Sequence, residues 1–107
     1  MAQTAPPSPT LNNAAAGNRQ VALDWTQAAS ASGYKVKYGT STGSYPNIID
    51  VGTVINFIVN SLTNNTTYYF VVTAYNAGGE SGPSNELNAQ PYQLMAVYSN
   101  DLCNNGT

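Results

Sequence analysis

Residues 62–76 constrain the fold of this chain more than any other segment. The segment opens with Leu62 and five polar residues that favour turns, and it continues into the run Tyr-Tyr-Phe-Val-Val-Thr-Ala-Tyr-Asn. Successive side chains of a β-strand point to opposite faces. One face of this strand would therefore carry Tyr68, Phe70, Val72 and Ala74, and the other Tyr69, Val71, Thr73 and Tyr75. A polar turn that leads into a long apolar strand predicts an all-β protein.

The spacing of Leu62 and Tyr68 bears on how this strand begins. Leu62 precedes Tyr68 by six positions, and the residues between them can keep the backbone hydrogen-bonded locally. The arrangement resembles the tyrosine corner of immunoglobulin-like sandwiches, in which a Tyr at the start of a strand bonds back to the upstream backbone. The alternative is an ordinary core tyrosine at a strand start. Tyr68 is structural under both interpretations.

The remaining strands follow from the same alternation. Strands are expected at residues 10–12, 19–25, 33–39, 47–51, 54–59 and 84–89, separated by turns rich in Gly, Asn and Ser. Ile55, Phe57 and Val59 would share one face, and residues 76–83 would form a glycine-rich turn. About seven short strands with a turn every 8 to 12 residues predict an antiparallel β-sandwich.

Composition limits the classes of partner. The chain has 107 residues, which suits one domain, and 42% of them are hydrophobic, so a sizeable core is expected. Only 7% are charged and the net charge is −2, so no basic stripe is available to bind nucleic acid. Such a weakly charged surface either favours self-assembly or reflects only a preference for Asn and Thr.

The titratable residues offer no constellation for catalysis. The chain contains no histidine, and its carboxylates are scattered through the sequence as Asp24, Asp50, Glu80, Glu86 and Asp101. General acid–base chemistry, a zinc site and a calcium site all need such groups in clusters. We therefore expect no enzyme activity, no metal and no cofactor. The single Cys103 cannot form an internal disulfide.

Several motifs in order identify a family. Val21-x-Leu23-x-Trp25, Gly33-Tyr34-x-Val36, the segment from Leu62 to Asn76, and Gly-Glu-Ser-Gly-Pro-Ser at 79–84 make the chain similar to a fibronectin type III domain over residues 6–91. The resemblance implies a seven-stranded antiparallel Greek-key β-sandwich with Trp25 as a core anchor. A buried Trp needs a partner for its indole N–H, or partial exposure. The expected core consists of Val21, Leu23, Trp25, Tyr34, Val36, Phe57, Leu62, Tyr68, Phe70 and Val72.

The domain organisation expected from the sequence has three parts. Residues 1–8 form a Pro-rich lead-in, residues 9–91 the fibronectin type III-like domain, and residues 92–107 a tail. The apolar run of the tail, with Leu94, Met95, Val97 and Tyr98, could add a strand, dock on a partner or begin a linker. The chain has no transmembrane run, and residues 1–9 lack the pattern of a leader, so a leader was either removed or never used.

The family resemblance implies a non-catalytic structural or binding module. One hypothesis is a component of a larger surface assembly, on a virion or filament or in adhesion, that binds protein partners or copies of itself. The alternative is a spacer or accessory module of a secreted bacterial polysaccharide-degrading enzyme. Both place the chain outside the cell or on a virion surface. The candidate partner face, which could also bind carbohydrate, is Lys35, Lys37, Tyr69, Val71, Thr73 and Tyr75. The alternative is that Tyr69 and Tyr75 only pair with side chains across the strands and stabilise the sheet.

Overall fold

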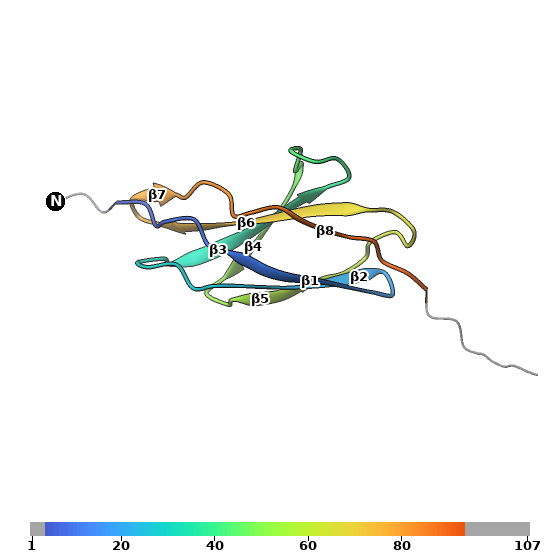
Figure 1. Ribbon diagram of the computed structural model, residues 1–107. Coiled ribbons are helices and arrows are strands. Elements are labelled where there is room, and N and C mark those ends of the chain that lie inside the picture. Colours follow the sequence, from blue (N-terminus) through green and yellow to red (C-terminus); the bar gives the residue numbers. More distant parts are fainter. Residues whose placement is uncertain (1–3, 94–107) are drawn as a thin grey trace, which may run out of the picture.

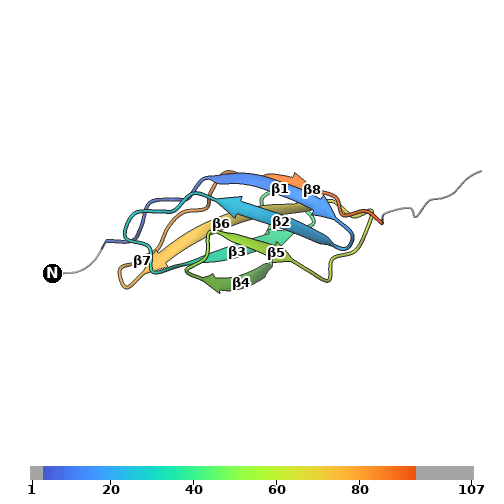
Figure 2. The same cartoon turned by 90° about the horizontal axis from the view of Figure 1, so that it is seen from below.

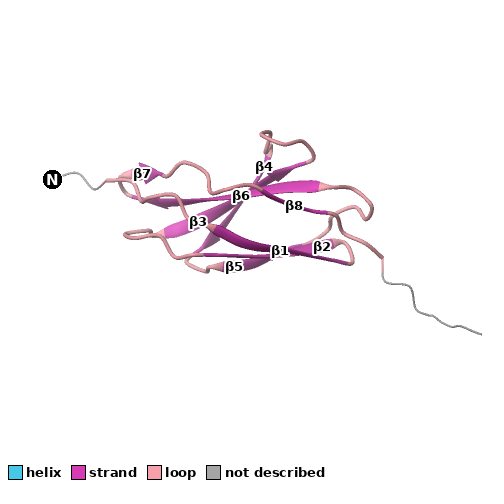
Figure 3. Cartoon of the chain, in the orientation of Figure 1, coloured by secondary structure: helices cyan, strands magenta, loops and turns pink. Residues whose placement is uncertain are grey.

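The computed structural model describes residues 4–93, which form two packed antiparallel β-sheets without a helix (Figures 1 and 3). The expected all-β sandwich is confirmed, with eight strands in this part of the chain where about seven were predicted. The strands are β1 (Leu11–Gly17), β2 (Gln20–Trp25), β3 (Gly33–Gly39), β4 (Asn47–Gly52), β5 (Asn56–Val59), β6 (Tyr68–Asn76), β7 (Gly79–Glu80) and β8 (Leu87–Ala89).

The two sheets differ in size. One has the order β1-β2-β5, and the other the order β4-β3-β6-β7, with β8 also paired to β6. Figure 2 shows the smaller sheet lying over the larger one. Alternate residues of β2, β3 and β6 point into the space between the sheets, and the buried apolar residues there include Val21, Leu23, Trp25, Tyr34, Val36, Leu62, Phe70 and Val72.

Strand β6 is the centre of the larger sheet. It pairs with β3 along seven consecutive positions, from Gly33 opposite Tyr75 to Gly39 opposite Tyr69. At its start, the Tyr68 hydroxyl accepts a hydrogen bond of 2.9 Å from the Thr63 backbone N–H. This is the backward bond that a tyrosine corner requires, and it holds the polar turn against the strand that follows it.

The last strand is divided, which differs from the single strand predicted at residues 84–89. β7 pairs with the end of β6 and β8 with its beginning, and Gly82 and Pro83 lie between them. Serine hydroxyls continue the pairing there: Ser81 Oγ accepts from Ala74 N at 2.9 Å, and Ser84 Oγ accepts from Val72 N at 2.8 Å. Because proline has no N–H to donate, the strand breaks at this point, and β7 begins inside the predicted turn.

The first strand is longer than residues 10–12. β1 continues through three alanines to Gly17 because it pairs with β2, from Leu11 opposite Trp25 to Gly17 opposite Gln20. Alanine has low strand propensity, so strand alternation did not predict this extension. Pairing with a neighbouring strand outweighs that weak preference.

Two expectations about the core need correction. Phe57 is only half-buried and Ile55 is exposed, because they lie on or next to β5, a short strand at the sheet edge. Trp25 is buried as expected, but its indole Nε1 has neither exposure nor a hydrogen-bond partner within residues 4–93. The Trp25 ring instead packs against the Tyr34 ring, at a centroid distance of 5.9 Å.

The described chain enters at one end of the sandwich and leaves at the other (Figure 1). At the entry end, the Asn76 side chain donates to the Thr4 carbonyl at 2.9 Å and to the Ser30 carbonyl at 3.0 Å. At the exit end, Tyr92 N donates to the Gly17 carbonyl at 3.0 Å. Both terminal segments are therefore fixed to the sandwich where they meet it.

Candidate functional site

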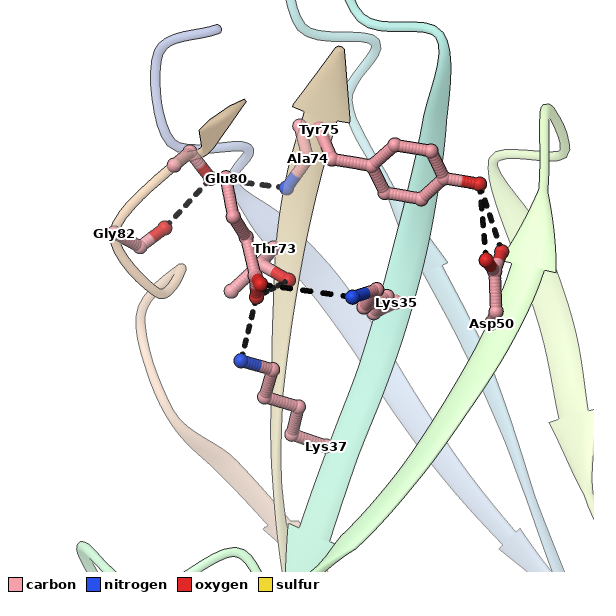
Figure 4. Close-up of polar contacts among 9 residues, drawn as sticks. Lys35, Lys37, Asp50, Thr73, Ala74, Tyr75, Glu80 and Gly82 are labelled. Atoms are coloured by element: carbon pink, nitrogen blue, oxygen red, sulfur yellow. Dashed lines mark hydrogen bonds and ion pairs between the residues drawn. The ribbon is translucent and has the colours of Figure 1, made fainter. Parts of the chain in front are cut away.

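The candidate partner face is the outer surface of β3 and β6, and Tyr75 covers one end of it. The Tyr75 side chain crosses β3 and donates to the two Asp50 carboxylate oxygens on β4, at 2.9 and 3.1 Å (Figure 4). It passes over Gly33, where a Cβ atom would lie 2.5 Å from Tyr75 Cζ. The residue opposite Tyr75 must therefore be glycine for the ring to take this path.

The hydrogen bonds around Asp50 shift the pKa of both partners. The Gly52 backbone N–H and then the Tyr75 hydroxyl hold the pKa of Asp50 below its ordinary value. The same bond to Asp50 raises the pKa of the Tyr75 hydroxyl. The Lys35 ammonium stands 5.6 Å from the centre of the Tyr75 ring, a cation–π distance. The Tyr75 side chain is thus held by residues of two other strands, β3 and β4.

Glu80 on β7 gathers the two lysines of the face. Its carboxylate lies 2.5 Å from Lys37 Nζ and 3.7 Å from Lys35 Nζ, and it accepts from the Thr73 hydroxyl at 2.7 Å (Figure 4). The hydrogen bond from Lys37 is the main reason that the pKa of Glu80 lies below its ordinary value, and Thr73 adds to this. The positive charges of the face are therefore matched by Glu80 and Asp50.

The contacts that Glu80 makes with Lys35, Lys37 and Thr73 are called the Glu80 network below. The partner face is less open than the sequence suggested. Val71 and Thr73 are each 2% exposed, so the outer row of β6 is not an open apolar patch. In register, Lys37 lies opposite Val71 and Lys35 opposite Thr73, and lysine stems cover apolar neighbours while their charged ends reach out. Tyr69 is half-buried and lies opposite Gly39 and Asn88, apart from the Glu80 network.

A second carboxylate, Glu86, was not singled out by the sequence. It accepts from the Thr42 hydroxyl at 2.7 Å, from Gly43 N at 3.0 Å and from the Tyr45 hydroxyl. These bonds, with the one from Tyr45 first, lower the pKa of Glu86. They tie the turn between β3 and β4 to the segment before β8. The partners are more than 40 residues apart in the chain, so no local pattern could have indicated the contact.

One apolar surface was also missed. Ile48 on β4 is 59% exposed and Ile58 on β5 is 46% exposed, and Val54 and Ile55 between the strands are exposed as well. β4 and β5 are edge strands of the two sheets and lie on the same side of the sandwich (Figure 2). Strand alternation could have predicted that Ile58 is exposed, because its side chain points to the face opposite to that of Phe57 and Val59.

Two further features, a pocket and a cluster of metal-binding side chains, are absent from the described part of the chain. Residues 4–93 enclose no pocket and contain no group of three or more His, Cys, Asp or Glu residues. No helix of this region is long and apolar enough to cross a membrane. The proposed docking tail, with Leu94, Met95, Val97 and Tyr98, lies outside the described residues.

Comparisons with known proteins agree with this architecture. The sequence model of the family described as fibronectin type III domain matches residues 5–90. A Kelch domain-containing protein of Saccharolobus solfataricus is 37% identical over 103 residues, which are 90% of this chain and 14% of that protein. An amylopullulanase of Thermoanaerobacter thermohydrosulfuricus is 37% identical over 90 residues, which are 82% of this chain and 6% of that enzyme. The chain thus spans only a small part of these curated relatives.

Solved structures give the same result for the fold. An Fn3-like protein from Clostridium thermocellum has a TM-score of 0.66 and 27% identity, with 89% of this chain and 99% of that one covered. A β-1,2-glucanase from Parabacteroides distasonis has a TM-score of 0.77 and covers 89% of this chain, but only 14% of the glucanase chain is involved. At 18% identity, this second likeness shows the fold alone.

Proposed function

The chain belongs to the fibronectin type III family, and we propose that it is a non-catalytic spacer that holds two flanking parts of a larger extracellular protein apart. The observation that carries the proposal is the position of the two ends of the described chain, at opposite ends of a sandwich to which both are hydrogen-bonded. A module held in this way keeps the parts on either side of it at a fixed distance, whereas a flexible linker does not.

The relatives support this proposal. The matching segment is a small part of a Kelch domain-containing protein and of an amylopullulanase, so similar modules occur within much larger chains. A place in a polysaccharide-degrading enzyme, which was the alternative expected from the sequence, is therefore favoured over a virion or filament. The Glu80 network supports it too, because a face whose charges are paired internally needs no partner to neutralise them.

The length of β6 sets the spacing. Ala77 follows this strand and Gln90 lies beside its start, so nine strand residues separate the two positions. At about 3.3 Å per residue, the ends of the spacer are about 30 Å apart. Spin labels are attached at Ala77→Cys and Gln90→Cys in a chain that carries Cys103→Ser. Pulsed electron–electron double resonance is expected to give one narrow distribution of the distance between the two labels. The same labels in concentrated urea provide the unfolded control. A broad or divided distribution in native buffer would remove the basis for a spacer.

A carbohydrate-binding role would give a different result. In native gels that contain pullulan or another soluble glucan, a spacer migrates as it does without the polymer. If the chain is instead retarded, and the Tyr69→Ser/Tyr75→Ser double variant is not, the module binds carbohydrate through its outer face. Far-ultraviolet circular dichroism of the double variant checks that the sandwich remains folded.

The apolar side formed by β4 and β5 favours a second candidate function, assembly with another copy of this chain. Ile48 and Ile58 are exposed beside two strand edges, and a net charge of −2 gives little repulsion between copies. Sedimentation at increasing concentration tests this function. Assembly would be supported if Ile58→Lys abolishes the dimer and Asn12→Lys does not. Asn12 lies on β1, at the other edge of the smaller sheet, and so serves as the control. A monomer at every concentration would exclude it.

A further inference from the structure

The turn before β6 contains two overlapping acceptor motifs for N-linked sugar. Residues 64–67 read Asn-Asn-Thr-Thr, so Asn64-Asn65-Thr66 and Asn65-Thr66-Thr67 both satisfy Asn-x-Thr. Such a motif is modified on exposed loops of proteins that pass through a secretory pathway. The sequence does not distinguish the two asparagines. The structure does, because their side chains have different surroundings.

Both ends of the Asn64 amide are already engaged. Its Oδ1 accepts from the Arg19 backbone N–H at 2.8 Å, and its Nδ2 donates to Asn18 Oδ1 at 2.9 Å. These bonds join the turn before β6 to the turn between β1 and β2. A sugar on Asn64 Nδ2 would have to enter between the two turns and break the contact with Asn18.

Asn65 has the opposite character. Its side chain is exposed and makes no hydrogen bond to any residue of the described range 4–93. Its backbone takes the left-handed conformation, with φ of 67°, and its N–H donates to the Pro91 carbonyl at 2.8 Å. The backbone of Asn65 is therefore fixed by its bond to Pro91, while the residue as a whole is exposed to solvent.

We propose that Asn65, and not Asn64, is an acceptor for an N-linked oligosaccharide. The donor is an oligosaccharide carried on a lipid phosphate or diphosphate, and an oligosaccharyltransferase transfers it. Asn65 Nδ2 forms a bond to the anomeric carbon of the first sugar as the bond from that carbon to the phosphate oxygen breaks. The phosphate oxygen leaves with the electron pair, and the amide loses one proton, which the lipid phosphate product takes up overall. No oxidant or reductant is needed.

The location suits such a modification. The sugar would project from the exit end of the sandwich, because Asn65 is bonded to Pro91 there. It would lie far from Tyr75 and Glu80, which are at the opposite end of β6. The proposal does not depend on the spacer function, because it requires only that the folded chain meets the transferase.

The experiment uses the folded 107-residue chain, a lipid-linked oligosaccharide and a single-subunit oligosaccharyltransferase that accepts Asn-x-Thr. All variants carry Thr107→Ala, which removes the third motif at residues 105–107. Thr67→Ala removes the motif of Asn65 and keeps that of Asn64, whereas Thr66→Ala does the reverse. The expected result is product with the parent chain and with Thr66→Ala, and none with Thr67→Ala. Intact mass reports the product, and fragmentation of the chymotryptic peptide Thr63–Tyr68, which contains both asparagines, reports the site.

A synthetic peptide of residues 60–71 is the control for the choice made by the fold. In the peptide, the fold engages neither asparagine side chain. The transferase preparation is chosen so that it modifies both asparagines of the peptide, and a preference for Asn65 in the folded chain then comes from the fold. The proposal is overturned if the folded chain is modified at Asn64, if Thr67→Ala still yields product, or if the folded chain yields none. Circular dichroism of both threonine variants verifies that they are folded, so a lost product reports on the acceptor.

Discussion

Tyr75 lies across Gly33 and donates its hydroxyl to both carboxylate oxygens of Asp50, so a β6 side chain reaches past β3 to hold β4. The contact depends on glycine at position 33, since any side chain there would occupy the path of the ring. It also explains why the outer face of the larger sheet is closed at one end. A tyrosine that could have met a partner is used within the fold.

Replacing Gly33 with Ala is expected to displace the Tyr75 ring and weaken its bond to Asp50. The added methyl group is an overpacking change, which costs about 1 to 3 kcal/mol. Urea unfolding measures the loss. In a Tyr75→Ala background the obstruction is absent, so the same Gly33→Ala change should cost much less. Equal losses in the two backgrounds would show that Tyr75 and Gly33 are not coupled.

The tyrosine corner predicts a stability loss for Tyr68→Phe. The change leaves the Thr63 backbone N–H without its partner at 2.9 Å, and an unsatisfied donor that is partly buried costs about 1 to 3 kcal/mol. Tyr69→Phe is the matched control, because the Tyr69 hydroxyl has no hydrogen bond within residues 4–93. Similar midpoints of urea unfolding for the two variants would contradict the assignment of the corner.

Ser84→Ala is expected to destabilise the junction between β7 and β8. Val72 N donates to Ser84 Oγ in a buried site, so the alanine variant leaves a buried N–H unsatisfied, at about 1 to 3 kcal/mol. The matched change Ser81→Ala, at the more exposed bond to Ala74, should cost less. Amide hydrogen exchange gives a local measure: Val72 should exchange faster in Ser84→Ala. Unchanged protection of Val72 would argue against the serine taking the place of a strand partner.

The three stabilised carboxylates predict a loss of stability in acid. Asp50, Glu80 and Glu86 have pKa values below their ordinary values of 3.8 for Asp and 4.5 for Glu. In this range the folded state binds fewer protons than the unfolded state, so stability rises with pH. Their contribution is fully present above about pH 5 and is lost as the pH falls through the folded pKa values.

Urea unfolding between pH 7 and pH 3 follows this loss, and the double variant Glu80→Gln/Glu86→Gln is the comparison. With the two Glu carboxylates removed, only the contribution of Asp50 remains, so the variant should lose less stability than the parent over the same interval. Curves of equal slope would mean that the Glu80 and Glu86 contacts do not stabilise the folded state.

The sequence predicted the fold better than it predicted the candidate site. Alternation marked the faces of β2, β3 and β6 because a strand places every second side chain on the same side, which is a local property. The backward bond of Tyr68 was also expected, since it spans only five residues. The extension of β1 and the division of the last strand depend instead on which segments pair, and pairing joins distant parts of the chain.

By itself, the sequence determined the sandwich, its family and the two faces of β6. Only the tertiary structure decided what those faces do. It placed Glu80 between Lys35 and Lys37, buried Val71 and Thr73, exposed Ile48 and Ile58 at the edges, and engaged Asn64 while leaving Asn65 in solvent. Exposure and hydrogen bonding depend on neighbours brought together from distant parts of the chain. Those neighbours are set by which strands pair and in what order, and strand pairing joins segments that are far apart in the sequence.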